Sequence, residues 1–390
     1  MVDGILPLAM FWVALCFVLY TYAGYPALLY LLTRMRKAPI GKDASYVPFV
    51  SFLIVAHNEE KVIARKLQNC LAFDYPADRL QINVASDGST DDTNEIVRGF
   101  RERGAVLLAF PKRMGKAHTL NQAIPLCQGD IVVLSDARQM FAPTAVRELV
   151  ANFADGTIGA VTGDLQFEPS PQNKNGEQIG IYWRYEKWIR TLQSHRDSTT
   201  VVTGAIYAVR KALFRSIPRT CIADDLSVPM NVVMQNYRVI FDPSAKAYDR
   251  YSRTLQEEFQ RRVRTIAGSY QYLVQTPKVL SPKTNRIWFD FLSHKACRIV
   301  APFALCAMLA GNMGLQALPY RIVLALQLAF YAAAGMGAIL AGKGRVPRAL
   351  SAPYTFLMLN LAAAVALFRL LAGNQTNLWE KAENLREASG

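Results

Sequence analysis

Charge is scarce in this sequence, and four long stretches contain none at all. Charged residues make up only 19% of the 390 positions, whereas hydrophobic residues make up 52%, which is more apolar than a typical soluble domain. Each uncharged stretch has roughly the 20 residues that a helix needs to cross a bilayer. We therefore expect four membrane-spanning helices, within residues 4–33, 299–320, 322–342 and 349–368.

The first uncharged stretch could instead be a secretory signal peptide, but its features argue against that. It is longer than the apolar core of a usual signal, its basic residues follow it, and no small-residue cleavage site comes after it. We expect a retained membrane helix over residues 1–33.

Basic residues lie unevenly around these stretches and predict their orientation. Cytoplasmic loops carry the excess of Lys and Arg, so we expect the segment between the first two spans in the cytoplasm, at the inner (plasma) membrane. Four spans then place the tail, residues 373–390, outside, although that tail also has the pattern of an interfacial helix. The loop between the second and third spans carries only Arg321. The basic residues that follow the first span or lie between the third and fourth are Arg34, Arg36, Lys37, Lys42, Lys343, Arg345 and Arg348.

Paired cysteines and nucleic-acid-binding modules are also missing. The six cysteines stand singly, without a C-x-x-C pair or zinc-ligand spacing, as in reduced cytoplasmic proteins. The net charge of +14 comes without a zinc finger or a stacking-aromatic module. We expect no nucleic-acid partner and attribute the charge to an anionic lipid bilayer and an anionic substrate.

The segment after the first span alternates between strand-like and helix-like patterns. Such alternation predicts a parallel sheet with right-handed crossovers. Ligands bind beyond the carboxyl ends of the strands in such sheets, and polar clusters at His57–Glu59, Asp87–Ser89, Gly115–Lys116 and Asp136 fall at that edge. The predicted strands cover residues 49–56, 81–86, 105–110 and 130–135.

The pattern becomes less regular after about residue 157. Helical spacing of apolar residues predicts helices over 181–193 and 255–266 and an amphipathic interface helix over 287–298. Residues 199–209 have the pattern of a strand broken by Gly204.

Six motifs follow one another in an order that resembles the membrane-integral family 2 glycosyltransferases. The closest likeness is to bacterial polysaccharide enzymes related to cellulose and hyaluronan synthases, and it covers roughly residues 48–270. The motifs are FLIVAHNEE, SDGSTDDT, GKAHTLNQA, SDAR, the glycine in VTGA, and ADDLSVPMNVVMQNYRVIFDP.

This resemblance implies an α/β fold of the GT-A type, a Rossmann-like nucleotide-sugar domain with a mostly parallel sheet, inserted between transmembrane helices. The cytoplasmic domain would cover residues 34–284. An interface helix over 285–298 and three transmembrane helices within 299–372 would follow.

The resemblance also implies a donor site at the edge of the sheet. Asp87 would accept a hydrogen bond from the imide nitrogen of uracil, whereas by its sequence alone it could simply cap the following helix. Lys116 would contact the diphosphate at a helix start, or it could be a solvated lysine. Ala56, Asn58 and Glu59 would border the nucleoside.

Asp136 matches the first acid of a D-x-D pair that holds Mg²⁺ or Mn²⁺ in the family. Arg138 stands where the second acid would be, and a guanidinium cannot ligate a cation. A hard cation can use one carboxylate together with substrate phosphates. Arg138 could face phosphate itself or pair with Asp136, so we expect metal at Asp136 and an arginine beside it.

The acceptor side of the expected site rests on two further matches. Asp224 and Asp225 match an acidic pair whose second member is the catalytic base in the family, so we assign the base to Asp225. The alternative is that the pair caps a helix. The stretch Thr203, Gly204 and Ala205 would line the acceptor site, since glycine permits close approach of a sugar ring.

The last family motif, Q-x-x-R-W, is incomplete here. Arg261 falls at the glutamine, Arg264 at the arginine and Thr265 at the tryptophan. The two arginines would clamp the diphosphate, or they form a solvated basic face. The missing tryptophan argues against processive polymerisation.

These features predict an inverting transferase that moves a sugar from a nucleotide diphosphate sugar, with uridine as the nucleoside, to a lipid-linked or glycan acceptor. Polysaccharide-assembly proteins are possible partners. A processive polysaccharide synthase is the first alternative. A transporter or a non-enzymatic membrane scaffold is the second, but a transporter would place charged residues within its spans.

Overall fold

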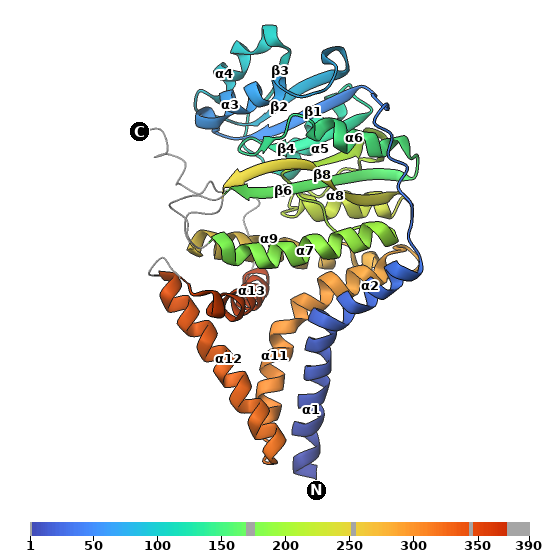
Figure 1. Cartoon of the computed structure of the whole chain (residues 1–390). Coiled ribbons are helices and arrows are strands. Elements are labelled where there is room, and N and C mark those ends of the chain that lie inside the picture. The colour runs from blue at the N-terminus through green and yellow to red at the C-terminus, as the bar shows by residue number, and fades with distance from the viewer. Residues whose placement is uncertain (1, 169–175, 251–254, 343–345, 373–390) are drawn as a thin grey trace.

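The structure is a computed structural model, and it describes residues 2–168, 176–250, 255–342 and 346–372. An α/β domain lies at one end, and long helices extend from the other (Figure 1). Two helices, α7 and α9, lie crosswise between these parts.

In the part of the chain that the structure describes, an eight-stranded sheet forms the centre of the α/β domain, in the order β3-β2-β1-β4-β7-β6-β8-β5. Strands β1 to β4 pair in parallel, as the alternating pattern predicted, and β6 pairs in parallel with β8. Strand β7 runs antiparallel to both of its neighbours. The strands are β1 (Val50–Ala56), β2 (Leu80–Asp87), β3 (Ala105–Phe110), β4 (Ile131–Asp136), β5 (Met140–Phe141), β6 (Ile158–Glu168), β7 (Tyr207–Arg210) and β8 (Arg238–Arg250).

Helices cover both faces of this sheet because β1 is apolar on both sides. Phe52 and Ile54 pack with α3, α4 and α6, whereas Leu53 and Val55 pack with α5 and α8. All seven residues of β1 are buried, as expected of a central parallel strand. The helices are α3 (Glu60–Leu71), α4 (Thr93–Gly99), α5 (Lys116–Leu126), α6 (Ala145–Ala151) and α8 (Asp224–Val233), with short 3₁₀ turns at Ala77–Arg79, Arg101–Arg103, Asn152–Ala154, Lys211–Leu213 and Pro277–Leu280.

The region after β6 differs from the expected pattern in one respect. The predicted helices exist as α7 (Gly176–Arg196) and α9 (Leu255–Gln275), but the strand expected over 199–209 is confined to β7. Thr203 and Ile206 form an isolated bridge, so the residues around Gly204 make a tight turn. Strand β7 begins only after that turn.

Among the described residues, four helices are long and apolar enough to cross a membrane, at Ile5–Met35, Trp288–Met313, Leu318–Gly342 and Arg348–Leu371. The interface helix expected over 287–298 is not separate, because it continues into the second of these helices through a π-turn. The helical segments are α1 (Val2–Leu19), a π-turn η1 (Tyr20–Gly24), α2 (Tyr25–Met35), α10 (Trp288–Phe291), a π-turn η7 (Leu292–Ala296), α11 (Cys297–Met313), α12 (Leu318–Gly342) and α13 (Arg348–Leu371). The predicted side of the tail 373–390 lies outside the described residues.

Helix α13 packs along α9, nearer to the sheet than the far ends of α11 and α12 (Figure 1). Val263 and Ala267 of α9 meet Ala362 and Ala366 of α13 in one apolar cluster. The hydroxyl of Tyr270 lies 3.1 Å from the carbonyl oxygen of Ile299 in α11 and 3.2 Å from that of Ala363 in α13, and its single proton can be shared between them. Helix α9 is thus fixed to α11 and α13.

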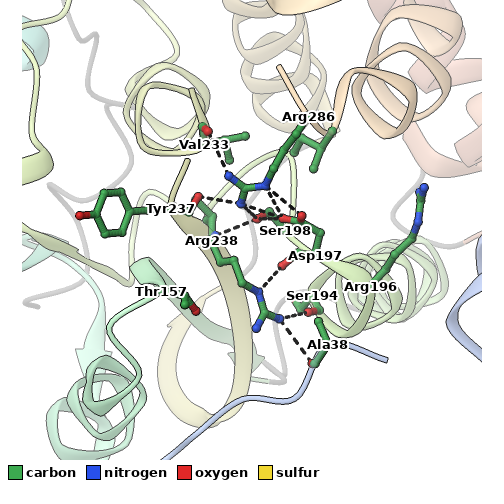
Figure 2. Close-up of polar contacts among 12 residues, drawn as sticks. Ala38, Thr157, Ser194, Arg196, Asp197, Ser198, Val233, Tyr237, Arg238 and Arg286 are labelled. Atoms are coloured by element: carbon green, nitrogen blue, oxygen red, sulfur yellow. Dashed lines mark hydrogen bonds and ion pairs between the residues drawn. The ribbon is translucent and has the colours of Figure 1, made fainter. Parts of the chain in front are cut away.

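Two arginines join the membrane-side segments to the sheet domain (Figure 2). Arg286, just before α10, donates from Nε and Nη2 to the carboxylate of Asp197 at 2.9 and 2.8 Å, and to the carbonyl of Tyr237 at 2.9 Å. Arg238 of β8 donates to the carbonyls of Ser194 at 3.0 Å and Pro39 at 2.8 Å. The linker after the first span and the segment before the second therefore meet the domain at one place.

Replacing Arg286 with methionine should weaken this joint. Its ion pair with Asp197 is partly solvated, with side chains 28% and 33% exposed, so we expect a loss of about 1–3 kcal/mol in unfolding free energy. Chemical or thermal unfolding of the full chain in detergent measures it. Arg98→Met removes an ion pair with Glu95 whose side chains are mostly exposed, and it should change the unfolding free energy by less than about 0.5 kcal/mol. Equal effects of the two changes would contradict the assignment.

Candidate active site

The polar clusters predicted from the sequence do meet at the carboxyl edge of the parallel strands. Asp136 lies at the end of β4, opposite Val55 of β1, and Ser86 of β2 lies opposite Ala56. Asn58 follows β1 with a left-handed backbone, φ 54°, and its Oδ1 accepts from the backbone N–H of Thr90 at 2.8 Å. The turns after β1 and β2 are therefore locked together beside the edge.

Two further contacts join these turns. The backbone N–H of Glu59 donates to Oγ1 of Thr93 at 2.7 Å, and His57 Nδ1 lies 2.8 Å from the carbonyl oxygen of Asp87. Asn58 and Glu59, which were expected to border a nucleoside, are thus held against the turn after β2, whereas Ala56 is buried at the end of β1.

Asp87 holds the loop that precedes Lys116. Its Oδ1 accepts from the N–H of Met114 at 2.7 Å, and its Oδ2 accepts from the N–H of Gly115 at 2.8 Å. The helix-cap alternative for Asp87 is wrong, because Asp91 accepts from Thr93 at the start of α4. Gly88, at φ +62°, lets the two loops approach, since a Cβ there would lie 2.4 Å from the backbone nitrogen of Arg113.

Lys116 contacts both the acid expected on the donor side of the site and one of the acids expected on the acceptor side. Its Nζ lies 2.9 Å from Oδ1 of Asp136 and 3.3 Å from Oδ2 of Asp224, and it is therefore no solvated lysine. Burial disfavours its charge, but the two carboxylates hold the pKa of Lys116 well above its usual range. One ammonium thus brings together acids from β4 and α8 that are far apart in the sequence.

Asp225 lies beside this ion pair and near Gly204. A Cβ placed on Gly204 would lie 3.5 Å from Cβ of Asp225 and 3.8 Å from Nζ of Lys116. Asp224 and Asp225 occupy the first turn of α8, and the cap position is Ala223, so neither acid is the helix cap. Burial and the neighbouring Asp224 raise the pKa of Asp225 to about 6. It remains mostly ionised at neutral pH and can accept a proton.

The structure places Arg138 differently from one of the two expectations. Its Nη2 donates to Oδ2 of Asp249 at 2.8 Å, and Asp249 also accepts from Gln139 at 2.8 Å. Arg138 therefore pairs with the end of β8 and not with Asp136. Its side chain is still 41% exposed, which leaves part of the guanidinium accessible.

Arg261 and Arg264 lie on α9, away from its apolar face. Arg261 pairs with the buried Glu258, which also binds Arg262. Burial lowers the pKa of Arg261, and the positive charges of Arg262 and Arg138 lower it further. Arg264, one turn further along, is half-buried.

Sequence reasoning missed Lys66, which contacts Ser135 and Gln139 on either side of Asp136. Its side chain is fully buried, its Nζ donates to Oγ of Ser135 at 2.8 Å, and it lies 4.4 Å from the ring centre of Phe141. Its signal was a lysine in line with Ile63 and Cys70 on the apolar face of α3. Asp249 gave no comparable signal.

Comparison with known proteins agrees with this geometry. Residues 51–217 match the family model described as glycosyl transferase family 2. The chain contains a family 2 glycosyltransferase domain. The predicted family, the enzyme class and the GT-A-like α/β fold are thereby confirmed.

Curated relatives match most of the chain at low identity. It is 27% identical to the probable glycosyltransferase YdaM of Bacillus subtilis, over 73% of this chain and 70% of the relative. It is 28% identical to the beta-monoglucosyldiacylglycerol synthase of Synechocystis, over 59% of this chain and 50% of the relative. For the poly-beta-1,6-N-acetyl-D-glucosamine synthase of Staphylococcus epidermidis the identity is 22%, over 62% and 59%. The chain thus spans little more than half the length of these two synthases.

Among solved structures, a mannosyltransferase from Pyrobaculum calidifontis, determined with GDP-mannose and Mn²⁺, superposes with a TM-score of 0.73. The match covers 94% of this chain and 100% of that one at 23% identity. The likeness establishes the fold, including the long helices, and nothing about the donor of this chain.

Replacing Lys116 with methionine should destabilise the protein, because Asp136 and Asp224 then lose the cation that both of them contact. We expect a loss of about 1–3 kcal/mol in unfolding free energy at neutral pH, less than for a fully buried pair because the side chains are partly exposed.

Unfolding of the full chain in detergent measures this effect, with the exposed Lys283→Met as the control. An equal change in stability in the two variants would show that Lys116 does not compensate the two carboxylates.

Proposed function

We propose that this chain is a membrane-integral, inverting glycosyltransferase. It moves a sugar from a uridine diphosphate sugar to a hydroxyl of a membrane-associated glycan or lipid-linked acceptor in polysaccharide biosynthesis. One observation carries the proposal: Lys116 binds Asp136 and Asp224 while Asp225 lies alongside, next to Gly204. A donor-side acid and an acceptor-side acid thus face one place.

The donor side combines a cationic surface with the edge of the sheet. Lys116, Arg138 and Arg261 supply positive charge for the diphosphate, and guanidiniums suit its paired oxygens. Arg264 would extend this surface along α9. Ala56, Asn58 and Glu59 border the base. Each carboxylate oxygen of Asp87 accepts one backbone hydrogen bond and keeps a second lone pair for the uracil imide.

Asp136 suits a divalent cation held mainly by the substrate. Within the described residues there is no cluster of three potential metal-ligating side chains, so an all-protein site is not available there. Mg²⁺ and Mn²⁺ sites can use one carboxylate with phosphate oxygens, and the Asp136 side chain is 20% exposed. A bound Mg²⁺ or Mn²⁺ would offset charge on the departing nucleotide; Lys116 and Arg138 provide fixed positive charge beside it.

Asp225 acts as the base on the acceptor side. Among the described residues its carboxylate has no hydrogen-bond partner, whereas Asp224 is engaged by Lys116. Asp225 takes the proton of the acceptor hydroxyl as the oxygen attacks the anomeric carbon from the face opposite the diphosphate. That single displacement inverts the configuration. Thr203, Gly204 and Ala205 position the acceptor.

The same geometry favours single additions over polymerisation. Thr265 stands where processive relatives carry the stacking tryptophan, and its hydroxyl donates to the carbonyl of Arg261 on its own helix. A processive synthase remains the alternative, and it would give a ladder of products in place of one. The positive-inside rule places the catalytic domain in the cytoplasm, with the four long helices in the inner membrane. Polysaccharide-assembly proteins would be its partners.

A donor panel tests the proposal. Purified full-length protein in nanodiscs, given membrane lipid extract as acceptor, should release nucleoside diphosphate from a uridine-linked sugar when Mg²⁺ or Mn²⁺ is present, and much less after chelation. Release from a guanosine-linked donor instead would contradict the choice of base. No release from any donor in the panel would contradict the transfer reaction.

Asp225→Asn should abolish turnover while leaving nucleotide binding intact. Loss of a general base costs about 10²–10⁴-fold, so we expect kcat to fall by at least 100-fold with unchanged UDP affinity by calorimetry. The wild-type rate should also fall on the acid side with an apparent pKa of about 6, because Asp225 must be ionised. Asp249→Asn is the matched control, since Asp249 pairs with Arg138 and should alter donor binding more than kcat. Normal turnover of Asp225→Asn would contradict the assignment of Asp225 as the general base.

A further inference from the structure

A second group of charged side chains lies on the membrane side of the acceptor region. Glu186 and Arg190 come from α7, Lys295 from η7 and Arg298 from α11. Helix α7 lies directly between the sheet domain and the apolar helices (Figure 1). The proposed donor site uses none of these residues.

The single acid of the group is already committed. Glu186 is buried and pairs with Nη1 of Arg298, and its other oxygen lies 3.4 Å from Nε2 of His294. Burial by itself would raise the pKa of Glu186, but Arg298 and His294 hold it well below its usual range. Glu186 therefore carries a full negative charge that Arg298 balances.

The remaining cations have no carboxylate partner. Arg190 is 8% exposed; its Nη1 donates to Oγ1 of Thr203 at 2.7 Å, and its Nε has no hydrogen-bond partner among the described residues. The half-buried ammonium of Lys295 has neither a hydrogen bond nor an ion pair within the parts of the chain that the structure describes. Buried Nε and Nη2 of Arg298 are likewise unsatisfied there. Asp225 interacts electrostatically with Arg190 and Lys295 without a direct ion pair, so among the described residues Glu186 is the only carboxylate in direct contact with any of the three cations.

Keeping such charges at a buried site opposes folding unless something pairs with them. Burial lowers the pKa of Arg190, which is the expected sign of an uncompensated cation. The free N–H groups of two guanidiniums and one ammonium match the oxygens of a phosphate. The cluster is therefore preorganised for an anion.

The position of the cluster indicates where that anion comes from. Arg190 binds Thr203, whose neighbour Gly204 is close to Asp225, so the cluster adjoins the acceptor side of the site. Lys295 and Arg298 lie within Trp288–Met313, one of the helices that can cross a membrane. A molecule that contacts all three cations has one end near the base and the other at the bilayer.

We propose that Arg190, Lys295 and Arg298 bind the phosphate or diphosphate of a lipid-linked acceptor. The acceptor is then an anionic phospholipid-type carrier and not a neutral glycolipid or a free glycan. Its identity as an acceptor rests on the proposed function, whereas the anion site itself does not.

Binding to the full-length protein in phosphatidylcholine nanodiscs tests the site without requiring turnover. A long-chain isoprenoid phosphate should raise the melting temperature, and the matching isoprenoid alcohol should not. Lys295→Met should raise the melting temperature of the ligand-free protein, since it removes a half-buried charge that has no ion pair among the described residues. It should also weaken binding of the isoprenoid phosphate by about 10- to 100-fold. Arg190→Met should weaken that binding similarly, and UDP affinity should be unchanged in both variants.

Lys283→Met is the control, because it removes an exposed positive charge from the loop before the same helix and should leave binding as in the wild type. Several outcomes would overturn the proposal: equal stabilisation by phosphate and alcohol, or unchanged binding in Lys295→Met. Protection by inorganic phosphate alone would assign the site to a free anion. A parallel loss of UDP affinity would assign the cluster to the donor. If the isoprenoid phosphate binds but no donor is turned over, the anion site stands and the proposed transfer fails.

Discussion

The ammonium of Lys116, held between Asp136 and Asp224, is the interaction on which the rest of the site depends. It joins the end of β4 to the first turn of α8. Its position is set in turn by Asp87, which fixes the backbone of Met114 and Gly115 just before α5. A cation shared by two carboxylates tolerates little displacement, since either acid would then be left partly buried without a partner. The position of β4 relative to the first turn of α8 depends on this one contact.

A second set of constraints relates this site to the membrane helices. Arg286 and Arg238 fix the segments that enter and leave the apolar helices to the sheet domain, while α7 and α9 lie between them (Figure 1). Helix α7 serves both sides, because Arg190 contacts Thr203 of the acceptor turn and Glu186 pairs with Arg298 of α11. A membrane-held substrate can therefore be bound by the same helix that supports the acceptor turn.

Much of the fold could be predicted from the sequence because local patterns report local environments. Strands β1 to β4 lie where the strand-like patterns placed them, with helices between them as the alternation predicted, and their polar ends meet because parallel strands share one edge. The strand expected around Gly204 was too long, since a turn and a bridge at Thr203 replace its first half. The segment expected as an interface helix before the second span is helical, but it does not end before that span, because a π-turn lets it continue into α11.

The sequence by itself determined the family, the α/β order and the choice of Asp136 and Asp224 as candidate site residues, because each depends on residue type and short-range spacing. Only the tertiary structure decided which partner each long charged side chain takes. Arg138 pairs with Asp249 and not with Asp136, and Asp87 accepts from the backbone of the loop before Lys116 and does not cap a helix. Lys66 donates to Ser135, the residue before Asp136. Such pairings join residues about 30 to 110 positions apart, and only the packing of whole elements sets which of several oppositely charged groups comes within reach.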